Sequence, residues 1–232
     1  KVNRSKIDNA FPLIKSLIKA AAEAGYDTFE DSNGFKQAGF GTFDVTIDNG
    51  KRQGVSRAYL NEIKGYKNLT IEYNTDVSKI IFKEKKAIGV EIKRNNHSEV
   101  YYCNKEVILS SGSINSPKIL QLSGIGDKKV LNKHGIDIIN HLPGVGKNLQ
   151  DHLEIYIQHK SKTKDTLYNL STNYFTQAVE GVKWFLLKKG MLTYSHLEVG
   201  GFVKTSEKYK HPNIQLHFFP SLVINHGLTK PS

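Results

Sequence analysis

Two polar side chains in this sequence stand where they could take part in a reaction. Glu154 lies in the alternating stretch 153–158 and faces away from its apolar residues, so its carboxylate could line a pocket and hold a cation. His217 lies in a second alternating stretch, 214–219. The residues alone leave a simpler interpretation open for each: a carboxylate facing solvent, and a half-buried histidine bonded to the backbone.

A turn of small residues is a second candidate site. The apolar stretch 107–109 predicts a buried strand that runs into this turn, and a helix follows, with Pro117 in its first turn and Gly124 at its left-handed end. Backbone N–H groups at such a helix start can face an anionic phosphate. Many α/β crossovers have this layout without a ligand, so the turn alone identifies none. The turn consists of Ser110, Ser111, Gly112 and Ser113.

Several competing motifs are incomplete. The stretch 144–147 (G-V-G-K) does not complete a phosphate-binding P-loop, because His141 stands at the first glycine position and Asn148 at the Ser/Thr position. A dinucleotide fingerprint G-x-G-x-x-G that begins at Gly144 breaks at Leu149. No G-x-S-x-G turn occurs, and the nine histidines show no metal-binding spacing, so we expect neither a hydrolase nor a metal site. No complete catalytic set is therefore predicted within the chain.

The order of residues around the turn is distinctive. G-S-I-N-S-P-K-I-L-Q-L-S-G-I-G at 112–126, followed by L-P-G-V-G-K-N-L-Q-D-H at 142–152, resembles the second signature region of the glucose–methanol–choline (GMC) oxidoreductases, which are FAD enzymes that oxidise alcohols. The segments 25–41, 196–202 and 211–227 also resemble this family, and the last two resemble its choline-oxidising members in particular. The resemblance covers essentially the whole chain but only the middle of such an enzyme.

The resemblance implies an FAD cofactor and assigns roles to individual residues. Val77 matches the valine whose backbone meets the adenine end of FAD, and residues 110–113 match the cofactor turn. Glu154 matches the carboxylate opposite the trimethylammonium group of choline, and His217 matches the catalytic-site histidine that holds the alcohol oxygen near the flavin. Tyr174 stands where the family has a tryptophan of the aromatic cage, so a weaker cage is expected. The implied reaction is oxidation of choline to betaine aldehyde, with hydride transfer to flavin N5.

The resemblance also sets expectations for the rest of the enzyme. The family's N-terminal G-x-G-x-x-G and C-terminal histidine base do not occur here, so we expect a segment of a longer protein that is inactive alone. The electron acceptor is not implied. A mitochondrial location, or a bacterial cytoplasm with inner-membrane association, is implied, and peripheral membrane association fits both. Three alternatives stay open: a GMC enzyme for another primary alcohol, a choline oxidase, and a basic binding module without enzymatic activity.

Hydrophobic periodicity predicts the elements that position these residues. Apolar residues at helical spacing predict helices over 9–24, 54–63 and 176–188, the last with Val179, Val182, Phe185 and Leu186 on one apolar stripe. Alternation and flanking turn residues predict strands over 69–73, 77–82, 87–93, 100–103, 107–109, 153–158 and 214–219. We therefore expect a mixed α/β (α+β) fold.

The resemblance divides this fold into parts of two domains. Residues 43–153 would hold part of a Rossmann-like FAD-binding domain with its β-meander. Residues 1–42 and 154–232 would belong to a substrate domain built on an antiparallel sheet.

Composition narrows the class of protein. The formal net charge is +11, but all but four of the 33 basic residues are Lys and they are scattered, which favours a solvated surface over a nucleic-acid interface. Cys103 is the single cysteine, so no internal disulfide is possible, and its strand-like setting favours an inert thiol. No apolar run approaches the roughly 18 residues that span a bilayer.

Overall fold

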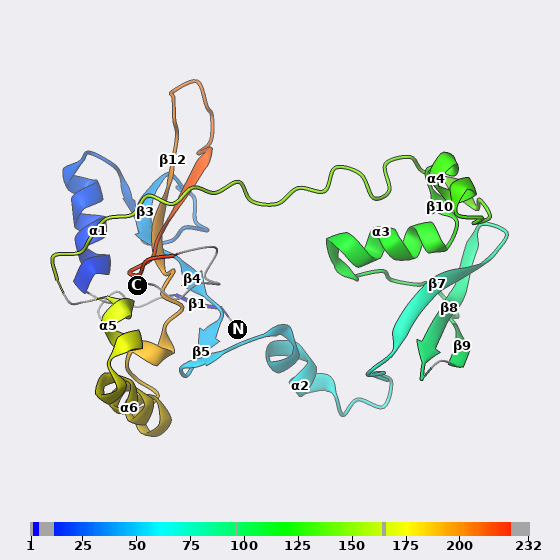
Figure 1. The fold of residues 1–232 in the computed structure, drawn as a ribbon, viewed down its shortest axis with the longest axis horizontal. Helices are drawn as coiled ribbons and strands as arrows, with labels where there is room; N and C mark the ends of the chain where they lie inside the picture. Colours follow the sequence, from blue (N-terminus) through cyan, green and yellow to red (C-terminus); the bar gives the residue numbers. More distant parts are fainter. Residues whose placement is uncertain (1, 5–11, 96, 164–165, 224–232) are drawn as a thin grey trace. The chain divides into compact units, whose positions relative to one another are not determined.

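The computed structural model describes residues 2–4, 12–95, 97–163 and 166–223. The chain divides into two compact units (Figure 1). The first unit combines Lys1–Tyr66 with Ile155–Ser232, and the second unit is Lys67–Glu154. The structure describes each unit by itself.

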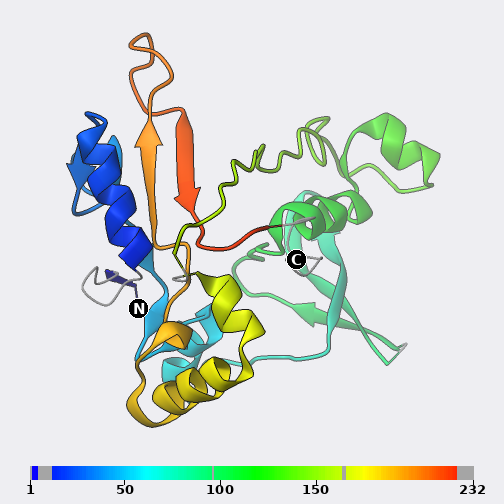
Figure 2. The same ribbon diagram turned by 60° about the vertical axis from the view of Figure 1, so that its left-hand side comes forward.

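A four-stranded sheet organises the first unit. Strand β12 pairs antiparallel with both of its neighbours, β13 and β3, and β2 adds to β3 in parallel. Figure 2 shows β12 and β13 as adjacent antiparallel arrows, so the strand predicted over 214–219 is confirmed. The order across the sheet is β13 (Ile214–Phe218), β12 (Val199–Val203), β3 (Gly39–Thr42) and β2 (Thr28–Phe29).

Helix α1 (Pro12–Glu23) covers one face of this sheet. Ile14 of the helix and Val199 of β12 form the buried centre, where α1 contacts both β3 and β12. The helix ends before Gly25, which adopts φ +85°, a backbone conformation that glycine reaches without strain. The predicted helix is therefore confirmed from Pro12 onward, and its first predicted residues, 9–11, lie outside the described residues. Leu17, Ile18, Leu167, Met191 and Phe218 pack around the centre.

Short ladders and helices complete the first unit. The ladders pair β1 (Asn3–Arg4) with β4 (Asp44–Val45), and β5 (Ile47–Asp48) with β6 (Lys51–Arg52). The helix predicted over 54–63 is a π-helical turn, Ser56–Leu60, that continues as α2 (Asn61–Ile63). The remaining helical elements are α5 (Leu167–Thr172), α6 (Tyr174–Val182), the π-helical turn η3 (Lys183–Leu187) and the 3₁₀ turn η4 (Met191–Thr193).

The α6–η3 helix exists where the sequence predicts it, but it does not bury the predicted stripe. Phe185 and Leu186, which we expected to face the core, are exposed. Glu180 and Trp184 point inward instead: Glu180 accepts a hydrogen bond from Met191 N–H at 2.6 Å, and Trp184 Nε1 donates to the Gly50 carbonyl at 2.7 Å. These two polar anchors fix the rotation of the helix, which hydrophobic spacing alone could not determine.

The second unit contains the predicted β-meander. Strands β7 (Asp76–Lys83), β8 (Lys86–Arg94) and β9 (His97–Tyr102) pair antiparallel in chain order. The tight connections use left-handed residues, Glu84 with φ +57° and Asn95 with φ +48°. One link from this sheet to the next helix is Ser123, whose Oγ accepts the Ile80 N–H at 2.8 Å.

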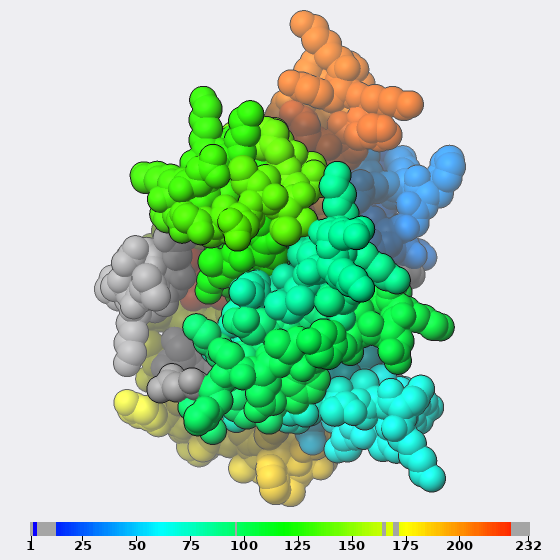
Figure 3. All heavy atoms as spheres, turned by 90° about the vertical axis from the view of Figure 1, so that its right-hand side faces the viewer, coloured from blue at the N-terminus to red at the C-terminus, as the bar shows by residue number. Residues whose placement is uncertain are grey.

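Helix α3 (Gly112–Leu122) packs against β7 and leads into a small crossover. In this crossover, β10 (Ile125–Gly126) pairs in parallel with β11 (Asn140–His141), and α4 (Lys128–Lys133) lies in the chain between the two strands. Gly124 follows α3 at φ +82°, which confirms its predicted left-handed conformation. In Figure 3 the side chains of the meander and of the 124–148 segment form one continuous surface.

Four local predictions are wrong. Residues 69–73, 107–109 and 153–158 form no strand, because among the described residues none pairs with them in a backbone hydrogen-bond ladder. Leu153, expected on an apolar face, is fully exposed (100%). Pro117 lies inside α3 rather than in its first turn, because the helix already begins at Gly112. Among the described residues, no helix is long and apolar enough to cross a membrane.

Candidate functional site

The start of helix α3 presents the predicted cofactor turn. Ser111 occupies the N-cap position, and Gly112 adopts φ +81° with open space where a Cβ would lie. The Ser111 N–H donates to Ser116 Oγ at 3.1 Å, and the predicted turn residues are all exposed. No acidic residue stands in the first turn, so an anion bound here would meet no like charge from the helix start.

An open groove of about 560 Å³ runs along this helix from Ser113 to Gln121. Two lysines line it, Lys118 from α3 and Lys147, which is paired with Asp127, from the loop opposite. The groove brings together the two sequence segments that carry the family signature, 112–126 and 142–152. The lining residues are Ser113, Ile114, Pro117, Lys118, Gln121 and the loop residues 146–150.

Gln121 fixes the loop against the helix. Its Nε2 donates to the Val145 carbonyl at 3.2 Å. A Cβ at Gly146, which has φ +79°, would lie 2.8 Å from the same Nε2, so this position admits only glycine at the present spacing. The groove wall therefore depends on glycine at position 146.

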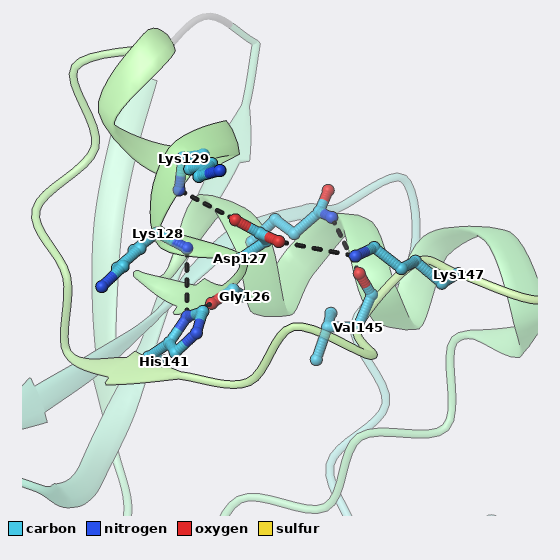
Figure 4. Close-up of polar contacts among 8 residues, drawn as sticks. Gly126, Asp127, Lys128, Lys129, His141, Val145 and Lys147 are labelled. Carbon is cyan, nitrogen blue, oxygen red and sulfur yellow. Dashed lines mark hydrogen bonds and ion pairs between the residues drawn. The ribbon is translucent and has the colours of Figure 1, made fainter.

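Asp127 holds the other end of the same loop (Figure 4). Its carboxylate caps α4 by accepting the Lys129 N–H at 2.9 Å and also meets Lys147 Nζ at 3.4 Å. The Lys129 N–H, and then Lys147, lower the pKa of Asp127 although partial burial opposes them. Beside it, His141 Nδ1 lies 3.2 Å from the Lys128 N–H. The lowered pKa keeps the Asp127 carboxylate charged, so the ion pair with Asp127 holds the Lys147 side chain in place.

Val77 belongs to the same unit as the turn. It is the second residue of β7, pairs with Ile92 of β8 and is 39% exposed. Because β7 packs against α3, the structure puts Val77 and the residues 110–113 on elements that contact each other. Its backbone role toward a cofactor stays a prediction.

Glu154 ends the second unit in an exposed, irregular segment. In the same segment, the His152 N–H hydrogen-bonds the carboxylate of Asp151 at 2.8 Å. This hydrogen bond is the main reason that the pKa of Asp151 is lowered. The segment therefore carries two exposed carboxylates three residues apart, of which the sequence singled out only Glu154.

His217 and Tyr174 both belong to the first unit. His217 lies on β13, exposed, with its ring edge-on to Phe43 at a centroid distance of 5.3 Å. Tyr174 is the first residue of α6 and is 86% exposed, so the described residues do not enclose its ring. Glu154 lies in the other unit, and no distance between it and these residues is defined.

Sequence reasoning missed the aromatic cluster beside His217. The rings of Phe29, Phe43 and Phe202 contact one another at centroid distances of 5.6 to 6.4 Å. The available signal was the alternation of glycine with phenylalanine in G-F-G-T-F at 39–43 and in G-G-F at 200–202.

A buried carboxylate also escaped notice. Glu198 is 2% exposed, and its Oε1 accepts the Ser195 N–H at 2.9 Å. Burial, and then the negative charge of Glu198, raise the pKa of the Tyr194 hydroxyl. Burial likewise lowers the pKa of His196, which favours its neutral form. The segment before β12 thus buries the carboxylate of Glu198 and partly buries Tyr194 and His196.

Comparison with known proteins relates the chain to flavin enzymes. The sequence profile described as GMC oxidoreductase matches residues 1–154. The human mitochondrial choline dehydrogenase is 45% identical over 227 residues, which are 98% of this chain and 38% of that protein. The oxygen-dependent choline dehydrogenase of Staphylococcus saprophyticus is 42% identical over 232 residues, 100% of this chain and 41% of that protein. The chain therefore spans about two fifths of these relatives.

Solved structures share the fold. An FAD-dependent oxidoreductase from Chaetomium thermophilum is 34% identical with a TM-score of 0.75, over 83% of this chain and 34% of that one. A formate oxidase from Aspergillus oryzae RIB40 is 23% identical with a TM-score of 0.79, over 95% and 42%, and this likeness concerns the fold alone. The mixed α/β fold expected from the sequence is confirmed.

Proposed function

The chain belongs to the GMC oxidoreductase family, and from this membership we propose that it forms the central part of an FAD-dependent enzyme that oxidises choline. One observation carries the choice of substrate: identity of 42–45% to choline dehydrogenases extends over at least 97% of this chain. The relatives include mitochondrial proteins of human and mouse and proteins of Staphylococcus, which supports a mitochondrial or a bacterial setting.

The second unit offers a fitting surface for a phosphate-bearing cofactor such as FAD. The free start of α3 supplies backbone N–H donors, and the groove beside it carries Lys118 and Lys147 without an acidic lining residue. We propose that residues 110–113 and the backbone of Val77 hold FAD there. When bound, FAD supplies the acceptor for the hydride that leaves the alcohol carbon.

His217 is the residue that we propose to hold the alcohol oxygen. Its imidazole is exposed on β13, so it can reach a ligand, and it can donate or accept a hydrogen bond near neutral pH. Such a contact would hold the hydroxyl in one orientation and stabilise negative charge that develops on its oxygen.

Glu154 is the residue that we propose to select the cation. A quaternary ammonium has no N–H, so only charge attraction and aromatic faces can recognise it. One carboxylate at about 4 Å contributes roughly 4 kcal/mol at an effective dielectric near 20. Tyr174 remains our candidate for an aromatic wall, which would add about 0.5 to 2 kcal/mol once its ring is enclosed.

Replacement of Glu154 by glutamine in the complete enzyme tests the choline assignment. The change keeps the shape and removes the charge, so binding of choline should weaken by about 2 to 4 kcal/mol. The neutral isostere 3,3-dimethylbutan-1-ol, which has carbon in place of nitrogen, should lose little. The measurement is the Kd or KM of both alcohols in the wild type and in Glu154→Gln.

Asp151→Asn is the matched control. Asp151 is also an exposed carboxylate, three residues away, so its loss should leave the ratio of the two alcohols unchanged. Equal losses for both alcohols in Glu154→Gln, or no loss for choline, would contradict the assignment of the cation site. A colourless complete protein that FAD cannot reconstitute would contradict the proposed function as a whole.

A further inference from the structure

His217 stands at the end of a row of residues that crosses the sheet of the first unit. His217 on β13 pairs with Gly200 on β12, and Gly200 pairs with Gly41 on β3. Gly41 in turn faces Phe29 on β2. Residues directly opposite one another point to the same face of a sheet, so His217 and Phe29 share a face with two glycines between them.

The two glycines leave room for aromatic rings on this face. A Cβ at Gly200 would overlap the Leu216 carbonyl of the neighbouring strand and would lie 2.9 Å from Cε2 of Phe43, and a Cβ at Gly41 would overlap the ring and the carbonyl of Phe29. Phe43 and Phe202 follow the two glycines at a spacing of two residues, which puts them on the same face. The rings of Phe29 and Phe43 therefore lie over glycine backbone.

The opposite face of the sheet has a different role. Val199 and Phe218 pack with α1 on that face, and Phe40 lies there over Gly201. The face with His217 is therefore the one that α1 leaves uncovered.

Phe43 is held firmly within its cluster. Its N–H donates to the Glu198 carbonyl at 2.7 Å, which fixes its backbone beside β12. Its ring is stacked with Phe29 at 23° and tilted on Phe202 at 60°. The same ring meets the His217 imidazole at 66°, the edge-to-face arrangement that aromatic pairs favour.

We infer that Phe43 is a positioning residue that holds the imidazole of His217 in its working orientation; this inference rests on the proposed role of His217. The exposed histidine gains little restraint from burial, because it lies on an edge strand of the described sheet. The ring contact with Phe43 selects one orientation, and the missing Cβ atoms at Gly41 and Gly200 leave room for the rings of this cluster.

The test uses the complete flavin enzyme and removes the ring of Phe43. Phe43→Leu should lower kcat/KM for choline about 3- to 10-fold, the size expected for one edge-to-face contact. Phe43→Tyr keeps the ring and should retain the kcat/KM of the wild type. Phe43→Met, a second ring-less variant, should behave like Phe43→Leu and serves if the leucine variant does not fold. Phe40→Leu removes a ring from the opposite face and should leave kcat/KM unchanged below its unfolding temperature.

A double substitution separates positioning from general damage. If Phe43 acts through His217, then Phe43→Leu should cause no further loss once His217→Asn is present. Additive losses, or full turnover in both ring-less variants, would overturn the inference while leaving the role of His217 intact. Full turnover in His217→Asn alone would remove that role and the inference together, whereas choline specificity would still be judged by Glu154→Gln.

Discussion

At the scale of single residues, Glu180 is a buried carboxylate of the first unit with two hydrogen-bond donors. It is 5% exposed, accepts the Met191 N–H at 2.6 Å and pairs with Lys183 Nζ at 2.6 Å. A Cβ at Gly190, which has φ +91°, would overlap its Oε2. Burial alone would raise the pKa of Glu180, but the hydrogen bonds from Lys183 and Met191 outweigh it and the pKa is lowered.

Replacement of Glu180 by glutamine should therefore destabilise the first unit in a pH-dependent way. Loss of the charged hydrogen bonds should lower the free energy of unfolding by about 1.5 to 3 kcal/mol at pH 7. The decrease should fall toward the lower value, because Lys183 is half exposed and water weakens its ion pair with Glu180. Because the folded pKa lies below the unfolded value of about 4.5, the contribution is complete above that pH and disappears as the pH falls through the folded pKa.

Urea unfolding of both proteins between pH 3 and pH 8 measures this effect. The wild type and Glu180→Gln should differ at neutral pH and converge in acid. A difference that stays constant down to pH 3 would show that shape, not charge, is what Glu180 contributes.

The sequence could not have predicted these residue-level features. Glu180 sits in a helix whose apolar residues suggested another buried face. Lys183 is a local partner three residues along the chain, but Met191 becomes a partner only once η4 folds back. Phe43 likewise becomes a neighbour of His217 only through the pairing of β3, β12 and β13. In contrast, the left-handed Gly25 and Gly124 were predictable, because helix ends impose a local backbone requirement.

At the scale of elements, Ser123 joins α3 to the meander. It is 6% exposed, its Oγ accepts the Ile80 N–H at 2.8 Å, and it donates to the Ile119 carbonyl at 2.5 Å. The Ile80 N–H of β7 therefore donates its hydrogen bond to a side chain instead of to a carbonyl of another strand.

Replacement of Ser123 by alanine should destabilise the second unit. The Ile80 N–H would be left buried without its acceptor, which costs about 1 to 3 kcal/mol. Hydrogen exchange of the β7 amides measures the change, and the Ile80 amide in particular should lose protection. Ser116→Ala is the control. Ser116 Oγ also accepts a backbone N–H, that of Ser111, but this N–H is exposed and can bond to water instead. Equal effects of the two substitutions would contradict the structural role of Ser123.

Prediction of the elements succeeded where the partner is close in sequence. The strands of the meander follow one another through short turns, so alternation and turn residues were enough. Alternation failed at 69–73, 107–109 and 153–158, because a strand also needs a neighbour and the described residues provide none.

At the scale of the whole molecule, the first unit is built from both ends of the chain while the second is continuous. Pairing of Val199 with Thr42 joins strands more than 150 residues apart, which no local pattern can foresee. Our division into cofactor-domain and substrate-domain segments remains a prediction about the complete enzyme.

The division into units predicts that a destabilising substitution in one unit leaves the stability of the other unit unchanged. Ser123→Ala and Glu180→Gln lie in different units and share no described partner, so their effects should add within about 0.5 kcal/mol. Hydrogen exchange read by mass spectrometry follows peptides from each unit separately in the two single variants and the double variant. Loss of protection in the second unit on Glu180→Gln would contradict independent units.

The hydrogen bond from Trp184 to Gly50 gives the chain an optical reporter. Trp184 is the only tryptophan of the 232 residues, and its indole binds a carbonyl 134 positions away while Lys188 Nζ lies 4.5 Å from the ring centre. Its fluorescence emission therefore senses whether the two distant segments of the first unit are joined. When they separate, the indole enters water and its emission shifts to longer wavelength, so assembly of this unit can be followed in real time without any label.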